Sequence, residues 1–197
     1  MNTFGSRFAA KQITGFAFGV ACLLSATSAS ASLIGVKTIE ISNSISQWLQ
    51  VAEFQAFDLG GTNVALGATA TSSTSWNGFS TPGKAIDDNT DGNFWNQSVF
   101  HDGVIGDTLK ITFSSAVDLS SITIFGRTDC CSDRDVYNLN FLDATGASIS
   151  RIDALDARGN NPASFQFPVA SVPEPGMLGL LGLGLTALAF LRRRRSV

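Results

Sequence analysis

Charged side chains are scarce in this chain of 197 residues, and histidine occurs only once. Asp, Glu, Lys and Arg make up 15% of the residues, against about 25% in an average soluble domain. A single histidine argues against a metal centre built from several imidazoles. The net charge of -3 argues against a nucleic-acid partner held by phosphate contacts. No long segment has helical periodicity, so the chain is not expected to be a helical protein.

Residues 1–31 have the pattern of a secretory signal peptide. Arg7 and Lys11 give a positive start, residues 13–24 form an apolar run, and Ala29 to Ala31 form a small-x-small cleavage site. The alternative is a membrane anchor, but the run is shorter than the roughly 20 residues that a spanning helix needs. We therefore expect residues 1–31 to be removed.

Residues 172–197 combine a proline-rich triplet, an apolar run and a basic cluster. The triplet is Pro173, Glu174 and Pro175, the apolar run covers residues 176–190, and four arginines follow at 192–195. The prolines stop a helix from continuing outward, and positive charge beyond an apolar run holds that end in the cytoplasm. This pattern predicts a transmembrane helix near the C-terminus.

The same residues, 172–197, resemble the PEP-CTERM sorting signals of Gram-negative bacteria over the whole tail. The resemblance implies recognition by an exosortase-type membrane enzyme and cleavage near the triplet. It also implies transient anchoring in the inner membrane, followed by delivery to the cell surface or the extracellular polymer. A plain C-terminal membrane anchor is the alternative.

Residues 32–171 remain as the working domain, with seven basic and fifteen acidic side chains and a net charge of -8. An acidic domain suits calcium and neutral ligands better than anionic polymers. Apolar and polar residues alternate in several short runs, which predicts strands at 36–41, 109–113, 122–125, 136–141 and 165–167. Several short strands in an exported domain of this size favour an all-β sandwich or jelly roll.

Two of the three cysteines are neighbours, Cys130 and Cys131, and the third, Cys22, leaves with the signal peptide. In an oxidising compartment the pair can bond only to each other or to another chain, and two free thiols are the remaining alternative. A bond between neighbours closes almost no loop and adds little stability. The pair therefore favours a surface role, as a rigid and polarizable sulfur ridge.

The chain's histidine, at position 101, precedes the pattern Arg-x-Asp-Cys-Cys-x-x-Arg at residues 127–134. This combination resembles the sugar-binding signature of the F-type lectins (fucolectins). Residues 63–67 with 72–74 resemble the opening strand of that family, and residues 84–92 resemble one of its loops. The resemblance implies the galactose-binding-like jelly roll shared with discoidin and the coagulation-factor C-type domains. It also implies a sugar site, whose residues here are His101, Arg127, Asp129, Cys130, Cys131, Arg134, Phe94 and Trp95.

The residue types suit a neutral sugar. Arg127 and Arg134 offer fixed donors, and the ring of His101 can donate or accept. We expect Asp129 to lock the Arg127 guanidinium by a charge-assisted hydrogen bond. In the family, the positions of Phe94 and Trp95 line a pocket for a 6-deoxy methyl group. Taken singly, each residue has a plainer interpretation, as a surface ion pair, a surface histidine or a core aromatic.

A calcium site is predicted beside the sugar site, because the loop from residue 87 to 98 carries oxygen ligands at short spacing. The family's calcium ligands correspond here to Lys84 (carbonyl only), Asp87, Asn89 and Ser98. The family completes this shell from its last strand, which residues 49–57 resemble, after a segment at 38–42 that resembles the penultimate strand. We therefore expect a circularly permuted domain in which the Ala52 carbonyl and Glu53 close the shell. The alternative is an added hairpin at 33–58 with a solvated Glu53.

Together these observations predict an exported, non-catalytic carbohydrate-binding module with structural Ca²⁺ and a glycan partner. The alternative is a structural matrix or adhesion domain of the same fold without a working sugar pocket. An enzyme is the third hypothesis. Paired carboxylates such as Asp87 and Asp91 are present, but calcium accounts for them better, and the chain has no nucleophile motif.

Overall fold

The computed structural model describes residues 32–159, 162–168 and 184. The signal peptide predicted at 1–31 and the triplet Pro173, Glu174 and Pro175 lie outside the described residues. The strands are β1 (Leu33–Asn43), β2 (Gln50–Val51), β3 (Glu53–Asp58), β4 (Thr69–Thr71), β5 (Phe100–His101), β6 (Thr108–Phe125), β7 (Val136–Leu142), β8 (Ser148–Asp156) and β9 (Ala163–Gln166). The short 3-10 helices are η1 (Val64–Gly67), η2 (Pro82–Ile86), η3 (Phe94–Asn96) and η4 (Ser132–Arg134).

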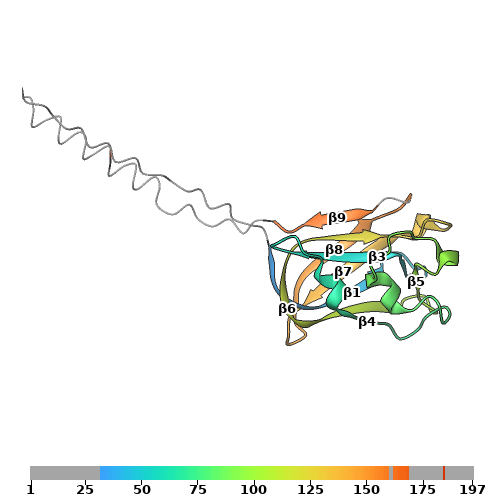
Figure 1. The fold of residues 1–197 in the computed structure, drawn as a ribbon, viewed down its shortest axis with the longest axis horizontal. Helices are drawn as coiled ribbons and strands as arrows, with labels where there is room; N and C mark the ends of the chain where they lie inside the picture. Colours follow the sequence, from blue (N-terminus) through green and yellow to red (C-terminus); the bar gives the residue numbers. More distant parts are fainter. Residues whose placement is uncertain (1–31, 160–161, 169–183, 185–197) are drawn as a thin grey trace, which may run out of the picture.

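The fold is all-β, as the alternating sequence pattern predicts (Figure 1). Seven strands form one antiparallel sheet in which β3, β6, β1, β7 and β8 are successive neighbours, while β4 and β9 also pair with β6. Two residues of β2 pair with β5 in a separate ladder. In the part of the chain that the structure describes, no helix is long and apolar enough to cross a membrane.

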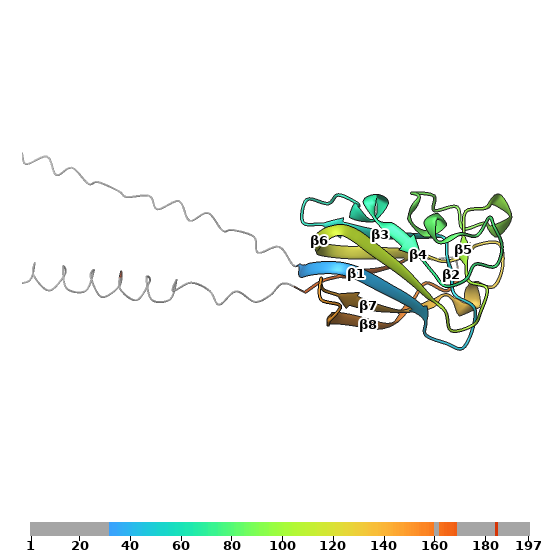
Figure 2. The same cartoon turned by 90° about the horizontal axis from the view of Figure 1, so that it is seen from below.

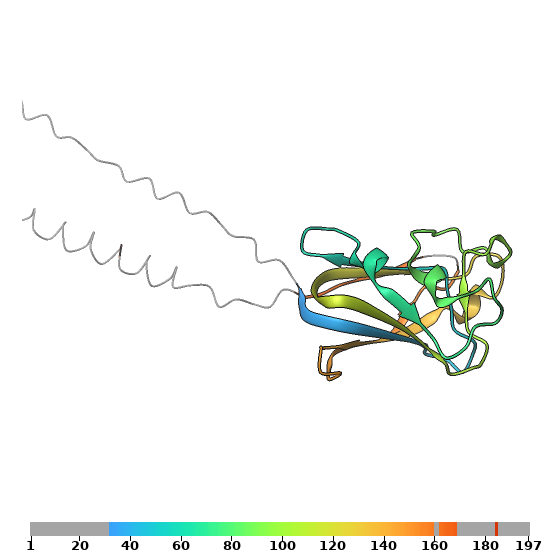
Figure 3. The same cartoon turned by 60° about the horizontal axis from the view of Figure 1, so that its bottom comes forward.

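The long strand β6 joins two layers of the domain (Figures 2 and 3). Ile111, in its first half, pairs with both β1 and β4, whereas Ile122, in its second half, pairs with both β3 and β9. Between them β6 curves, and residues 114–116 at the curve are exposed. The two halves of β6 therefore contribute to two layers that enclose the apolar core.

The core is formed by the inward-facing residues of both layers. Ile39 and Phe141 come from one layer and Phe54 and Ile124 from the other, and all four are fully buried in a single cluster. Burial of a side chain of this size stabilises the fold by roughly 1.5–3 kcal/mol relative to exposure. This apolar cluster therefore holds the two layers together.

The two ends of the domain meet at the curve of β6. Leu119 pairs with Leu33 of β1 on one edge and with Asp58 of β3 on the other. On the edge opposite β3, Gln166 of β9 pairs with Ser121. Strands β9 and β1 therefore follow one another end to end along the same edge of β6. Both ends of the described domain, the start of β1 and the end of β9, therefore lie at this pole, and β5 and the loops around it lie at the other (Figure 1).

Several expectations from the sequence need correction. Residues 63–67 do not form a strand, because Asn63 caps η1 by accepting a hydrogen bond from the Ala65 amide. The runs at 109–113 and 122–125 belong to one strand, β6. The run at 49–57 is divided at Ala52 into β2 and β3. Residues 33–58 are not a hairpin, since β6 lies between β1 and β3.

Candidate sugar-binding site

The predicted sugar-binding residues gather at the pole opposite the termini. A cavity of about 270 Å³ opens there. It is lined by Trp48, Trp76, Phe94, Trp95, His101, Arg127 and Arg134. These residues come from five separate segments of the chain: the loop before β2, the loop after β4, η3, β5 and the loop that links β6 to β7. The cavity thus places the domain's histidine and two of its arginines among four aromatic rings.

Arg127 is held in one orientation by the carboxylate two residues further along the chain. Its Nε and Nη2 atoms donate to the two oxygens of Asp129, each at 2.8 Å, and its Cζ atom lies 4.5 Å from the ring centroid of Phe94. The Asp129 carboxylate also accepts from the Phe94 amide at 2.9 Å, and the Arg127 hydrogen bonds lower the pKa of Asp129. The guanidinium that faces the cavity is therefore preorganised.

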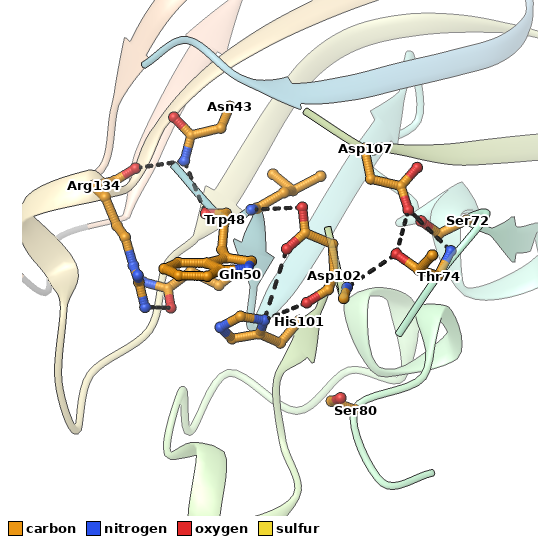
Figure 4. A network of polar contacts seen from close by, with 12 residues as sticks. Asn43, Trp48, Gln50, Ser72, Thr74, Ser80, His101, Asp102, Asp107 and Arg134 are labelled. Carbon is orange, nitrogen blue, oxygen red and sulfur yellow. Dashed lines mark hydrogen bonds and ion pairs between the residues drawn. The ribbon is translucent and has the colours of Figure 1, made fainter. Parts of the chain in front are cut away.

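Arg134 reaches the cavity from η4 and is held less completely. Its Nη2 donates to Oε1 of Gln50 at 3.2 Å, and its Cζ lies 5.6 Å from the ring centroid of Trp48. Figure 4 shows this guanidinium beside the Trp48 and Gln50 side chains. The Nε atom of Arg134 is buried and has no partner among the described residues.

His101 is almost fully buried between aromatic rings, and its surroundings define its hydrogen-bonding role. Nδ1 lies 2.7 Å from the carbonyl oxygen of Asp102, which can only accept, so Nδ1 carries the proton. Burial, and next the charges of Arg134 and Arg127, lower the pKa of His101. The ring is therefore neutral at pH 7, and its Nε2 presents a lone pair to the cavity beside the two cationic donors.

The adjacent cysteines form a disulfide, with Cys131 in the left-handed region at φ 61°. Cys130 is half-buried and Cys131 is exposed. Neither residue is among those that line the cavity. The carbonyl oxygen of Cys131 accepts from Gln50 Nε2 at 3.0 Å, so the bridge connects to the site through its backbone. A direct sugar contact through the sulfur ridge remains a prediction.

A buried polar network that was not predicted from the sequence contacts the two arginines of the cavity. Asp135 accepts from Gln50 Nε2 at 2.8 Å and from the Arg127 amide at 2.9 Å. The Tyr137 hydroxyl donates to the Gln50 carbonyl oxygen at 2.7 Å. Burial raises the pKa of Asp135 to about 6. Gln50 therefore links the loop that carries Arg134 to β2, and nothing in the local sequence around residue 50 indicates this contact.

Asp102, directly behind His101, should make the stability of the fold depend on pH. One carboxylate oxygen accepts from the Leu49 amide at 2.9 Å, and the other is buried without a hydrogen bond from the described residues. Burial raises its pKa from 3.8 to about 6. The folded state then binds the proton more tightly than the unfolded state, so this residue's contribution to stability is lost as the pH rises from about 4 to about 6.

Asp102→Asn should remove that dependence, because the amide keeps an oxygen for Leu49 and stays neutral. Denaturant unfolding of both proteins at pH 4 and pH 7 measures how their unfolding free energies change with pH. Relative to the variant, the wild type should lose about 2 kcal/mol of unfolding free energy between the two pH values. Parallel pH profiles for the two proteins would contradict the prediction.

Glu53, one of the predicted calcium ligands, contacts the loop that begins at Asp87. The Glu53 side chain is fully buried, and its Oε2 accepts from the amides of Asp87 and Asp88 at 3.1 and 3.2 Å. Its Oε1 is buried and receives no hydrogen bond from the described part of the chain. Burial, and next the charge of Asp87, raise the pKa of Glu53 to about 8. The interpretation of Glu53 as a solvated acid is therefore wrong.

The predicted side-chain ligands Asp87, Asn89 and Ser98 lie along the loop from residue 87 to 98 and already have protein partners. Asp87 accepts from the Asn89 amide at 3.3 Å and is 3.5 Å from Lys84 Nζ. The Ser98 hydroxyl donates to the Asn93 carbonyl oxygen at 2.9 Å. Among the described residues, no group of three or more His, Cys, Asp and Glu side chains could hold a metal ion. An orphaned carboxylate oxygen beside a second carboxylate nevertheless fits a cation whose shell includes backbone carbonyls.

Comparison with known proteins assigns the C-terminal tail. The PEP-CTERM protein-sorting motif matches residues 171–195. The tail is a sorting signal. Proteins with this motif are exported by Gram-negative bacteria, processed by an exosortase and sorted to the cell surface. No curated protein and no solved structure matches the chain. The sorting motif therefore implies that the protein is exported and sorted, and it assigns no chemistry to the β-domain.

Proposed function

We propose that residues 32–171 form a non-catalytic carbohydrate-binding module that the sorting signal delivers to the cell surface. There it would bind fucose-like neutral sugars of extracellular polysaccharide or of another cell. The observation that carries the proposal is the cavity at the pole away from the termini. It unites two oriented arginines and a neutral histidine with aromatic rings, in a domain whose net charge is -8.

Each part of the cavity has a complementary part in a sugar. Arg127 and Arg134 donate hydrogen bonds to ring and hydroxyl oxygens, and Nε2 of His101 accepts from a hydroxyl. The rings of Trp48 and Trp76 pack against the apolar face of a pyranose. Phe94 and Trp95 supply apolar surface for a 6-deoxy methyl group, which discriminates between sugars by roughly 1–3 kcal/mol.

We also propose that the fold is a galactose-binding-like jelly roll whose chain is circularly permuted. The position of β9 and β1, end to end on one edge of β6, supports it, since joining these two ends would give one unbroken edge segment. The contact between Glu53 and the loop at 87–88 is also what the permutation predicts for the strand that closes the calcium shell.

In this proposal Ca²⁺ is a structural ion. Glu53 and Asp87 would bind it through their carboxylates, Asn89 and Ser98 through side-chain oxygens, and Lys84 and Ala52 through carbonyls. The ion supplies positive charge to two neighbouring carboxylates and fixes the loop. That loop leads directly into η3, so calcium would hold Phe94 and Trp95 in place at the sugar cavity.

A glycan array tests the proposed function on the full chain, purified in a zwitterionic detergent because glycoside detergents carry sugars themselves. We expect binding to fucosylated glycans in Ca²⁺ and weaker binding after treatment with a chelator. Binding to no sugar in either condition would refute the proposal and favour a structural adhesion domain without a working pocket.

Glu53→Gln should abolish the response of the fold to calcium, because it removes the charge that the ion would neutralise. Excess Ca²⁺, at about 100 times the Kd, should stabilise the wild type by about 2.7 kcal/mol and leave the variant unchanged in thermal unfolding. Glu40→Gln, a change at a carboxylate paired with Lys110 at 2.8 Å, is the matched control and should respond like the wild type. An equal calcium shift in Glu53→Gln would exclude this site.

A further inference from the structure

A second cavity of about 260 Å³ lies beside the sugar cavity and is not explained by binding of a single sugar ring. Phe94 and Trp95 line both cavities, while Asn77, Phe79 and Gln97 line only the second. The two cavities have closely similar volumes. Because Phe94 and Trp95 line both, the two cavities are neighbouring compartments with this aromatic pair between them.

The loop at residues 76–80, held by β5, fixes the spacing between the two cavities. Trp76 lines the first cavity and Asn77 and Phe79, next along the same loop, line the second. Each end of this loop is hydrogen-bonded to the backbone of His101 in β5. The Trp76 amide donates to the His101 carbonyl oxygen at 2.8 Å, and the His101 amide donates to the Ser80 carbonyl oxygen at 3.3 Å. A ligand that spans both cavities would thus meet a surface of fixed geometry.

The second cavity combines exposed aromatic rings with uncharged amides. Phe79 is 62% exposed and Trp95 is 79% exposed, which leaves large apolar faces open to solvent. The Asn77 side-chain oxygen accepts from the amides of Phe79 and Ser80 at 2.9 and 3.0 Å, which orients its amide group. Gln97 ends η3 in a left-handed conformation with φ 60°.

From this geometry we infer that the second cavity binds a second sugar ring of the same glycan. The inference rests on the proposed function of the first cavity. Of the residues that the structure describes, none with a charged side chain lines the second cavity, which disfavours an ionic ligand. An aromatic face and amide groups together match a pyranose, which has one apolar face and a rim of hydroxyl groups. The preferred ligand would then be an oligosaccharide.

Phe79→Ala tests this inference because Phe79 lines only the second cavity and is exposed, so the fold should tolerate the change. Isothermal titration of the full chain in zwitterionic detergent compares methyl α-fucoside with the fucosylated oligosaccharide that gives the strongest array signal. Leu59→Ala is the control, since Leu59 is also an exposed apolar residue and does not line either cavity.

We expect the wild type and Leu59→Ala to bind the oligosaccharide about tenfold or more tightly than the single ring, which corresponds to about 1.4 kcal/mol. Phe79→Ala should lose that advantage and keep its affinity for methyl α-fucoside. If Phe79→Ala keeps the preference for the oligosaccharide, or if the wild type binds both ligands equally well, the second cavity does not bind a sugar ring. The proposed sugar site in the first cavity is unaffected by either result. If the wild type binds neither ligand, the proposed function fails and the inference fails with it.

Discussion

Arg134→Ala is expected to weaken glycan binding by about a hundredfold or more while the domain stays folded. A hydrogen bond from a charged donor contributes about 1.5–3 kcal/mol, and the change also removes the cation that lies over Trp48. Since about 1.4 kcal/mol corresponds to a factor of ten in affinity, the loss of both contacts accounts for the expected effect. Titration with the fucosylated glycan that gives the strongest array signal measures it.

Arg151→Ala is the matched control for that experiment. Arg151 lies on β8, is exposed, and donates to Asp153 at 2.6 Å. Its loss should leave binding unchanged, because an exposed ion pair contributes at most about 1 kcal/mol to stability. Arg134→Lys should bind the glycan weakly, since lysine keeps the positive charge but lacks the planar guanidinium and its paired N–H donors. If Arg134→Ala binds as the wild type does, the assignment of the sugar site is wrong.

Gly126→Ala should destabilise the fold by about 3 kcal/mol and disrupt the sugar cavity at the same time. A methyl group at this position would overlap the Asp135 carboxylate, which is fully buried and accepts from the Arg127 amide and from Gln50. Overpacking of a rigid interior costs about 1–3 kcal/mol, occasionally more, and a displaced Asp135 would lose its hydrogen bonds as well. Denaturant unfolding and glycan titration should both report the change.

Gly67→Ala separates this steric effect from a general effect of replacing glycine. Gly67 ends η1, and an added methyl group there would meet no heavy atom of the described residues within 4 Å. The change should be neutral, or stabilise the fold by up to about 1 kcal/mol by restricting the unfolded chain. A Gly126→Ala protein as stable as Gly67→Ala would show that Asp135 can move without consequence.

The sequence was informative where the determining contacts are local. Alternation within single strands revealed an all-β domain, and Arg127 and Asp129, two residues apart, were expected to pair. Contacts between distant segments were not accessible in the same way. Gln50 and Asp135 are separated by 85 residues, and no periodicity or motif connects a glutamine in a short strand with an aspartate in a distant loop.

The path of β6 was missed for a related reason. The polar, exposed residues Ser114 and Ser115 interrupt the alternation at the middle of the strand, and such an interruption is typical of a turn between two strands. The interruption here corresponds to the curve where one strand passes from one layer to the other. The resemblance to the lectins placed the site residues in one region, but Trp48 and Gln50 joined the site only when the fold was known.

The opposed positions of the site and the termini determine how the domain would bear tension. With its tail held at the cell and its far pole on a glycan, the domain would be pulled along its long axis. Strand β9 runs along this axis beside the second half of β6, and the hydrogen bonds of an antiparallel pair lie perpendicular to the strands. A pull on the C-terminal side of β9 therefore loads these bonds together in shear. They cannot open one after another, as they would if the strand were peeled from its end.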